Sequence, residues 1–474
     1  MISNSVSGTP AVFGRSSSRQ TCADRPLFGE GAHKPAKCAS QSQRRGIAMP
    51  SQIADYAHDA WAALLEHYAA IRRFTEELAA RLSPEDQCVQ SMPDASPAKW
   101  HLGHTAWFFE SFILERFDAG YKPVDRGYSF LFNSYYDALG PRHSRAERGL
   151  ITRPSAAEVI AYRRRVDEAI AALFHTASDA ARSSIATVID LGLNHEQQHQ
   201  ELILTDIKHA FFRNPMFPCY APPAIAAVHP AAPLRWIDFR GGAVSIGHDG
   251  DVFAYDNERP RHEVLLAPYR LASRPVTCGE YLGFIEERGY DRPRLWLSDG
   301  WATARAEGWK APSYWFKDDH GDWRIFTLNG VKTLDPDEPV AHVSLYEAAA
   351  YAEWAGKRLP TEFEWEAAAA TEAVAGHFLD PARPHPERSV DGPGLNQIYG
   401  DVWEWTRSSY DPYPGFKPFS GAAAEYNGKF MIGQVVLRGG SCATPDGHIR
   451  PTYRNFFPPN ARWQFSGIRL AEDA

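Results

Sequence analysis

Two histidines, His195 and His199, are the residues of this sequence best suited to bind a metal ion. They lie in a segment with helical periodicity, residues 185–212. At about 100° per residue, positions i and i+4 share one helix face, so both imidazoles can reach one ion. Glu201 lies roughly 200° further round from His199 and is not expected to join them. Two imidazoles leave a coordination sphere unfilled, so another segment must supply a ligand. The alternative is a polar helix face that carries two histidines.

A second predicted helix carries two more histidines. The segment 92–117 contains His101 and His104, three residues apart, and either one could complete a three-histidine site. Apolar residues at helical spacing predict two further helices, over 51–82 and 155–174. Helical bundles commonly build metal sites from side chains that project inward. Histidines packed in a helical core are the alternative.

The connection between the second and third predicted helices is long and carries functional side chains. It spans roughly 35 residues, which is longer than a simple connection. It contains Tyr135, Tyr136, Arg142 and Arg145. Tyrosine hydroxyls can donate hydrogen bonds or protons, and arginine side chains bind carboxylates. We expect a functional loop here. The alternative is an ordered surface loop with structural tyrosines.

Composition restricts the class of protein. The 474 residues suffice for about two or three domains. A net charge of −8 argues against nucleic acid or an anionic membrane as a partner. No apolar run approaches the ~20 residues that span a bilayer. The six cysteines show no CxxC spacing and no secretory segment is apparent, so a reducing cytoplasm is the expected location. The absence of a GxGxxG or P-loop motif predicts no nucleotide cofactor.

Composition also divides the chain. Residues 1–48 are rich in Ser, Arg, Gln and Gly, so we expect a disordered leader, interpreted as an over-extension of the reading frame before Met49. A helical domain is predicted over 49–214, and a Pro/Ala-rich linker over 215–233. Residues 234–474 are predicted to form an irregular α+β domain, with strands near 244–246, 263–266 and 435–437 and helices near 277–288 and 345–356.

Five ordered blocks of the second domain resemble the formylglycine-generating-enzyme (sulfatase-modifying-factor) domain. They are residues 275–281, 354–366, 400–406, 438–441 and 467–471. The resemblance implies a C-type-lectin-like fold. Members that make formylglycine use two cysteines shortly after the Arg-Gly-Gly-Ser block, where this chain has Thr444 and Ile449. Cys442 is out of that register and is interpreted as a small core residue. Formylglycine synthesis is therefore not expected, since no thiolate pair is available.

The helical domain has a matching resemblance. Residues 96–105 (Ser-Pro-Ala-Lys-Trp-His-Leu-Gly-His-Thr) and 195–201 (His-Glu-Gln-Gln-His-Gln-Glu) are similar to the DinB-like domain of the ergothioneine-biosynthesis sulfoxide synthases. Those enzymes, the hercynine oxygenases, join a DinB-like four-helix bundle to the same second domain in this order. The resemblance covers essentially all of residues 49–474.

This resemblance implies a metal centre and a reaction. In the family, three histidines hold a non-haem iron(II), and they match His104, His195 and His199, with His101 as a neighbour. The family reaction uses O2 as co-substrate to join a cysteine-derived thiol to C2 of the imidazole of hercynine (Nα-trimethylhistidine), giving a sulfoxide. The chain is thus expected to be an iron(II)-dependent oxygenase, with the small molecules hercynine and cysteine as its partners.

The resemblance also implies residues that bind hercynine. Gln198 matches a glutamine that touches the substrate imidazole, and Asn455 matches a residue near the trimethylammonium group. Aromatic faces attract quaternary ammonium ions, and Phe456, Trp403 and Trp405 are the candidates.

The expected thiol donor follows from one position at which this chain differs from some members of the family. Members that use γ-glutamylcysteine carry an aspartate two residues after the matching asparagine, where this chain has Phe457. Free L-cysteine is therefore expected. The pair Tyr135 and Tyr136 resembles the cysteine-using branch, and one of them is assigned as proton donor or redox partner. The cysteine carboxylate is assigned to Arg142, Arg145 or Arg462.

Other functions remain as alternatives. They are the same reaction with γ-glutamylcysteine, a relative that uses a selenium donor, and a relative that acts on histidine in the ovothiol pathway. Usual members of that pathway carry a further methyltransferase domain, for which the sequence after the last block leaves no room. A non-catalytic lectin-like binding module with structural histidines is the alternative outside the enzymes.

Overall fold

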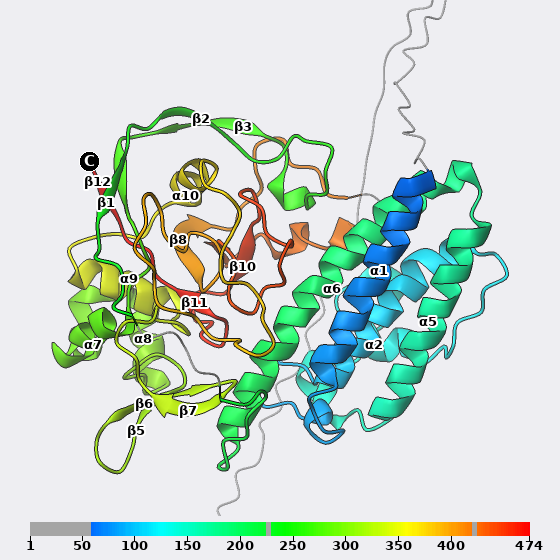
Figure 1. The fold of residues 1–474 in the computed structure, drawn as a ribbon, viewed down its shortest axis with the longest axis horizontal. Helices are drawn as coiled ribbons and strands as arrows, with labels where there is room; N and C mark the ends of the chain where they lie inside the picture. Colours follow the sequence, from blue (N-terminus) through cyan, green and yellow to red (C-terminus); the bar gives the residue numbers. More distant parts are fainter. Residues whose placement is uncertain (1–57, 224–228, 420–423) are drawn as a thin grey trace, which may run out of the picture. The chain divides into compact units, whose positions relative to one another are not determined.

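Long helices make up the first part of the structure. The computed structural model describes residues 58–223, 229–419 and 424–474 (Figure 1). The long helices are α1 (His58–Ala79), α2 (Ala98–Phe109), α5 (Ala156–Thr176) and α6 (Asp179–Arg213). Helix α6 packs against α1 and α2, and α2 packs against α5. The predicted helices are confirmed; residues 51–57 and the predicted leader, 1–48, lie outside the described residues.

The boundaries of these helices have local causes. Within the predicted segment 92–117, helix α2 begins at Ala98, directly after Pro97, because proline suits a helix entrance. After Phe109 the chain continues as a π turn, η2 (Glu110–Leu114), and one further turn, α3 (Glu115–Phe117). Helix α5 opens with a capping box, in which Ser155 and Glu158 each accept the other's backbone N–H.

A buried ion-pair cluster ties three of the helices together. The carboxylate of Glu196, on α6, accepts from Arg72 of α1 and from Arg163 of α5, each at 2.8 Å. All three side chains are buried. The two guanidinium groups lower the pKa of Glu196 to about 2 despite the opposing effect of burial. Glu196 directly follows His195, so the cluster holds α6 in place beside the predicted metal-binding pair.

The connection between α3 and α5 contains short helical turns. They are α4 (Tyr128–Phe132), η3 (Asp137–Leu139) and η4 (Arg145–Leu150). The Trp100 indole donates to Leu131 O at 2.9 Å, and the Arg148 guanidinium donates to Ser96 Oγ at 2.9 Å. The connection therefore packs against the start of α2, beside the histidines of that helix.

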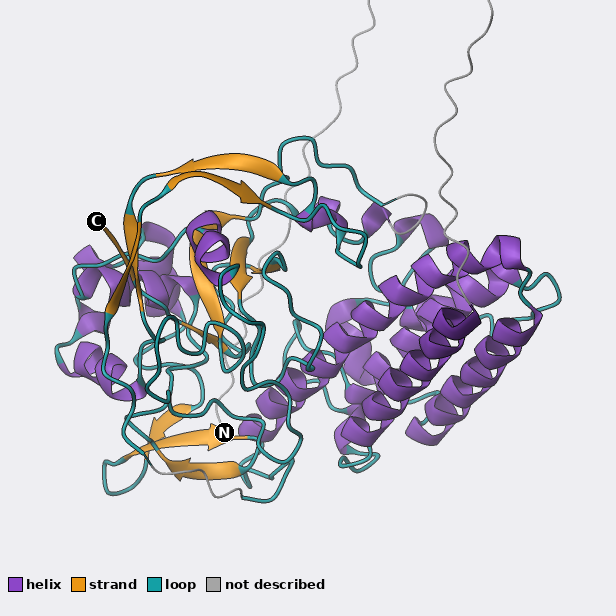
Figure 2. Cartoon of the chain, turned by 45° about the horizontal axis from the view of Figure 1, so that its top comes forward, coloured by secondary structure: helices purple, strands orange, loops and turns teal. Residues whose placement is uncertain are grey.

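Short strands, helices and much loop form the second part (Figure 2). A four-stranded sheet has the order β10 (Asn455–Phe457), β9 (Val435–Arg438), β8 (Trp403–Ser409), β11 (Ser466–Gly467). The other sheets are β1 (Trp236–Phe239) with β4 (Tyr269–Ala272) and β12 (Ala471–Asp473), β2 (Gly242–Ile246) with β3 (His262–Leu266), and β5 (Trp315–Lys317) with β6 (Trp323–Thr327) and β7 (Gly330–Thr333). The helices are α7 (Cys278–Glu286), α8 (Ser298–Ala306), α9 (Leu345–Trp354) and α10 (Glu362–Ala369). The predicted α+β class is confirmed.

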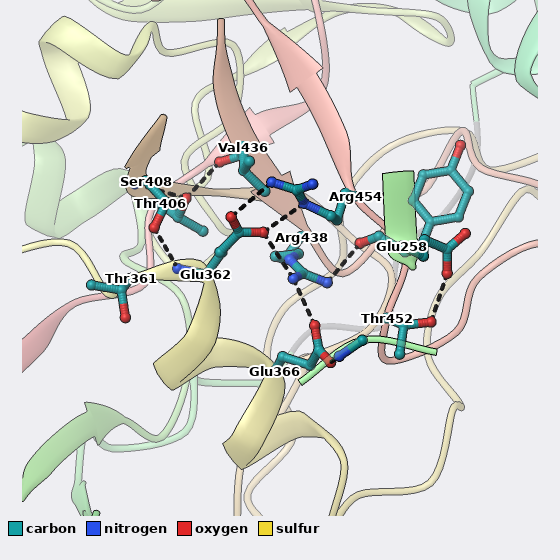
Figure 3. A network of polar contacts seen from close by, with 12 residues as sticks. Glu258, Thr361, Glu362, Glu366, Thr406, Ser408, Val436, Arg438, Thr452 and Arg454 are labelled. Atoms are coloured by element: carbon teal, nitrogen blue, oxygen red, sulfur yellow. Dashed lines mark hydrogen bonds and ion pairs between the residues drawn. The ribbon is translucent and has the colours of Figure 1, made fainter. Parts of the chain in front are cut away.

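A second buried ion-pair network holds β9 and β10 against α10 (Figure 3). The carboxylate of Glu362 accepts from Arg438 at 3.0 Å and from Arg454 at 2.8 and 2.9 Å. Arg438 also donates to Glu366 at 2.7 Å. Removing one partner from such a buried network leaves an unpaired charge, which is unfavourable by several kcal/mol, about 3 to 5. Because Arg454 directly precedes Asn455, the network also sets the position of a predicted substrate residue.

The two parts of the chain contact each other extensively. The described residues, from 58 onward, belong to one compact unit. In the predicted linker, the backbone N–H groups of Tyr220 and Ala221 donate to Leu328 O of the second part. The predicted domain boundaries at 214 and 234 stay a prediction. Within the described ranges, no helix is both long enough and apolar enough to cross a membrane.

Candidate active site

Three buried histidines meet between α2 and α6. His104 of α2 and His195 and His199 of α6 each offer a ring nitrogen, and these atoms lie within 4.8 Å of one another. Nε2 of His195 is 3.2 Å from Nε2 of His104 and 3.0 Å from Nε2 of His199. Separations of about 3 Å suit neighbouring ligands of one ion with metal–nitrogen bonds of ~2.1 Å. His101, the other candidate on α2, lies outside the group.

The hydrogen bonds indicate which ring nitrogens are free to bind. Nδ1 of His104 lies 2.6 Å from Phe132 O, an acceptor, so Nδ1 carries the proton and Nε2 offers its lone pair. Burial is the main cause that lowers the pKa of His104 and His199 well below its ordinary value, and that of His195 to about 3. All three rings are therefore neutral near neutral pH, the form in which imidazole binds metals.

A cation satisfies the three nitrogens better than protons can. His195 has at most one proton for Nε2, yet this atom faces the Nε2 atoms of both other histidines. Its Nδ1 has no hydrogen-bond partner among the described residues. Unpaired polar atoms in a buried site are unfavourable. A metal ion bound by all three nitrogens removes the conflict, and imidazole ligands suit iron, copper, nickel and zinc.

A cavity of about 830 Å³ adjoins the histidines. Its volume is in the range of sites that hold small molecules. Its walls come from α6, from the loop between α3 and α5, and from the second part of the chain. The lining includes Tyr135, Arg142, Arg145, Arg148, His195, Gln198, His199, Trp403, Tyr426, Tyr453, Asn455, Phe456 and Phe457. The structure thus brings most of the sequence-predicted site residues around one space.

Arg462 and Tyr136 are predicted residues that do not line this cavity. Arg462 donates to the carboxylate of Glu347 at 2.7 Å and lies over the Trp309 ring at 4.1 Å. Its charge is already paired there, so the structure does not bring Arg462 to the cavity with Arg142 and Arg145. Tyr136 is fully buried behind Tyr135, with ring centroids 4.6 Å apart, and its hydroxyl has no partner among the described residues.

Comparison with known proteins relates both parts of the chain to known families. Residues 54–203 match the DinB superfamily, and residues 235–389 and 380–474 match the sulfatase-modifying factor enzyme 1-like domain. Hercynine oxygenase of Mycolicibacterium smegmatis is 34% identical over 421 residues, which cover 81% of this chain and 92% of the relative. This chain belongs to the hercynine oxygenase family. Hercynine oxygenase of Mycobacterium tuberculosis is 34% identical over 417 residues, covering 81% and 93%.

As a member of the hercynine oxygenase family, the protein is an oxygenase and hence an oxidoreductase. It has a DinB-like helical domain followed by a sulfatase-modifying-factor-like domain with sheets. The second domain alone is also similar to the formylglycine-generating enzyme of Streptomyces coelicolor, which is 30% identical over 308 residues, covering 54% of this chain and 95% of the relative.

Glu201 connects α6 to the second domain of this family member. Its carboxylate accepts from the Trp403 indole at 2.7 Å, from Ser441 at 2.7 Å and from Thr444 at 2.8 Å. It therefore faces away from the histidine group, as the helical geometry predicts. Thr444 stands at one of the positions where formylglycine-making relatives are expected to carry cysteine, and here its hydroxyl serves this contact between domains. The thiol of Cys442 is buried, which raises its pKa well above the ordinary value.

Gln198 is held by two tyrosines that sequence reasoning did not identify. Its amide nitrogen donates to Tyr453 Oη at 2.7 Å, and the Tyr426 hydroxyl donates to its amide oxygen. The Tyr426 ring centroid lies 5.5 Å from that of His195. Burial raises the pKa of Tyr426 well above its ordinary value, so the hydroxyl beside the three histidines keeps its proton. Neither tyrosine belongs to a recognisable motif, and only folding brings them to α6.

Arg148 is a further cavity residue that was missed. Its guanidinium donates to Ser96 Oγ at 2.9 Å and to Ser134 Oγ at 3.2 Å, and it lies 3.3 Å from the centre of the Trp100 ring. The printed partners of its two terminal nitrogens are thus neutral hydroxyls, and burial lowers its pKa to about 9. The available sequence signal is its three-residue spacing from Arg145, since the 3₁₀ turn η4 aligns these two positions.

Proposed function

We propose that this protein joins L-cysteine to the imidazole C2 of hercynine with O2, giving hercynylcysteine sulfoxide in ergothioneine biosynthesis. The C2–H and S–H bonds are lost and a C–S bond forms. One oxygen atom of O2 becomes the sulfoxide oxygen, and the other leaves as water, so O2 accepts four electrons. The observation that supports this proposal most directly is the three-histidine group, which opens onto a cavity lined by Gln198. We infer a cytoplasmic location for this reaction.

His104, His195 and His199 are proposed to hold iron(II). When bound, iron(II) would supply the redox chemistry that lets O2 react with the two substrates. Three neutral imidazoles leave the ion's charge uncompensated and coordination positions open, as in other non-haem iron sites, although those more often use two histidines and a carboxylate. This charge favours an anionic thiolate as a neighbouring ligand. The residues of the chain then orient the substrates and move protons.

Gln198 and the aromatic wall are proposed to bind hercynine. Because Tyr426 and Tyr453 occupy one acceptor and one donor position of the Gln198 amide, its remaining positions can be directed at the substrate imidazole. The trimethylammonium group is proposed to lie near Asn455 and the faces of Phe456 and Trp403. Trp405, the further aromatic candidate, is fully buried and donates to Val343 O, so we leave it out of the site.

The arginine side of the cavity is proposed to bind the cysteine carboxylate. Arg142 and Arg145 line the cavity, although Arg142 also pairs with Asp137 and Arg145 donates to Asp94 O. Phe457 lines the same cavity and brings no carboxylate to receive the amino group of a γ-glutamyl arm. Free cysteine is therefore the proposed thiol donor.

An aerobic assay of iron(II)-loaded protein tests the proposed function. Hercynine is offered with cysteine and, separately, with γ-glutamylcysteine, and the products are read by mass. We expect a sulfoxide from cysteine alone. Product from γ-glutamylcysteine alone would keep the reaction and reject the thiol assignment. No product with either thiol would reject the proposal in favour of histidine or a selenium donor, and absence of stoichiometric iron would favour a non-catalytic module.

Tyr135 is proposed as the loop tyrosine that acts in the reaction, since its side chain reaches the cavity and that of Tyr136 does not. Tyr135→Phe is expected to slow sulfoxide formation by about 10²-fold, as loss of a proton donor does. Tyr136→Phe is the matched control and is expected to have a smaller effect. Steady-state rates of product formation check this. Unchanged rates in both variants would reject the loop assignment and leave Tyr426 as the candidate donor.

The finer fold assignments belong to this proposal as well. We infer a DinB-like four-helix bundle over residues 49–214, built on α1, α2, α5 and α6. The linker covers 215–233, and a C-type-lectin-like domain covers 234–474. The helix contacts and the mixed short sheets support these assignments.

A further inference from the structure

His101 forms a buried bridge between one metal-binding histidine and a carboxylate. Its Nδ1 lies 2.8 Å from Nδ1 of His199, and its Nε2 lies 3.1 Å from Oδ2 of Asp206. All three side chains are at most 7% exposed. The same carboxylate oxygen accepts the backbone N–H of Ser96 at 2.7 Å, which fixes Asp206 at the entrance of α2.

The direction of these hydrogen bonds follows from the chemistry of each group. The Asp206 carboxylate accepts, so His101 carries a proton on Nε2. A neutral His101 then has a lone pair on Nδ1, and Nδ1 of His199 must donate to it. His199 is left with its lone pair on Nε2, the atom that faces the other two histidines. The chain Asp206, His101, His199 thus selects the tautomer of His199 that can bind a metal.

The other two histidines lack such a connection. Nδ1 of His104 is paired with the neutral carbonyl of Phe132. Nδ1 of His195 has no partner in the described part of the chain. Among the described residues, hydrogen bonds thus link His199, and neither of the other two histidines, to an anion. A negative charge behind an imidazole increases the basicity of its metal-binding nitrogen.

We propose that Asp206 and His101 are positioning residues that orient His199 and increase its donor strength toward the metal. The proposal rests on the three-histidine metal site of the proposed function. It makes His199 the strongest of the three donors. Because a stronger donor stabilises the higher oxidation state more, Asp206 also lowers the iron(III)/iron(II) potential.

Three variants separate the contributions of Asp206 and His101, which together form the relay to His199. Asp206→Asn removes the anion while keeping an acceptor for the Ser96 N–H. His101→Leu removes the hydrogen bond at Nδ1 of His199. His101→Asn keeps an acceptor near His199 Nδ1 but cannot reach Asp206, so it tests orientation without the charge. The matched control is His209→Asn, on the same helix, where the histidine contacts Ser91 instead.

Anaerobic titration of the metal-free protein with Co(II), followed by its visible absorption, measures binding. We expect Asp206→Asn and His101→Leu to weaken Co(II) binding by about 10- to 100-fold at unchanged stoichiometry. His101→Asn should recover part of that loss. The iron midpoint potential should become more positive in Asp206→Asn, and His209→Asn should match the wild type in both measurements.

The outcomes distinguish this inference from the proposed function. If the wild type binds neither Co(II) nor iron(II), the metal site itself is rejected. If the wild type binds and the variants of both relay residues bind as tightly, with an unchanged Co(II) spectrum and potential, the relay is rejected. Should Asp206→Asn fail to fold by circular dichroism, the comparison of His101→Leu with His101→Asn decides the question.

Discussion

Replacement of His195 by alanine is expected to abolish iron binding and sulfoxide formation together. Nε2 of His195 lies 3.2 and 3.0 Å from the corresponding atoms of His104 and His199, so it occupies the middle of the group. Two remaining imidazoles on different helices cannot hold the ion tightly, because no carboxylate of the described residues belongs to the group and could replace the third ligand. We expect less than about a tenth of the wild-type iron content after anaerobic loading.

Metal analysis and the product assay, run on the same samples, check this prediction. His67→Ala is the matched control, since His67 is an exposed histidine of α1. It should leave both measurements unchanged. Wild-type iron content in His195→Ala would show that the ion binds elsewhere, and full activity without iron would reject the metal-dependent reaction.

The second large effect is expected from Glu196→Gln, through stability. The substitution removes the charge that compensates the buried guanidinium groups of Arg72 and Arg163, each 2.8 Å from the carboxylate. Arg72 keeps its ion pair with Asp167 at 2.7 Å, but Arg163 loses its close partner, since its other carboxylate, Glu76, lies 3.6 Å away. Breaking such a buried pair lowers the free energy of unfolding by about 3 kcal/mol. Urea unfolding of the metal-free proteins, followed by far-ultraviolet circular dichroism, measures the difference. Glu66→Gln, at an exposed position of α1, is the control and should change stability little.

The pH dependence gives this prediction a further test. The pKa of Glu196 is lowered from 4.5 to about 2 by the two arginines. A lowered pKa in the folded state contributes stability that is complete above pH 4.5 and is lost as the pH falls toward 2. The difference between wild type and Glu196→Gln should therefore shrink over that interval. A difference that stays constant would contradict the assignment of a buried, ionised Glu196.

The sequence by itself determined the parts of the site that depend on local geometry. The spacing of His195 and His199 places both on one helix face, whatever surrounds the helix. The same angular argument excludes Glu201 from the metal, and the structure shows it bonded to Trp403, Ser441 and Thr444 instead. Helix positions were predictable for the same reason, since apolar periodicity, capping residues and prolines act within a few residues.

Only the tertiary structure decided how separate segments meet. Periodicity on α2 left His101 and His104 equivalent, and the packing of α2 against α6 places His104 in the histidine group and His101 behind His199. Tyr426 reaches Gln198 from 228 positions away along the chain, a contact that no local pattern encodes.

Two arginines show the same physical limit. Arg462 had the right chemistry for a carboxylate, but Glu347, distant in sequence, pairs with it. Arg148 was not singled out in the sequence, yet packing against Trp100 buries it in the cavity wall. Residue type and spacing specify what a side chain can do. Which partner it finds depends on contacts between elements that the fold alone brings together.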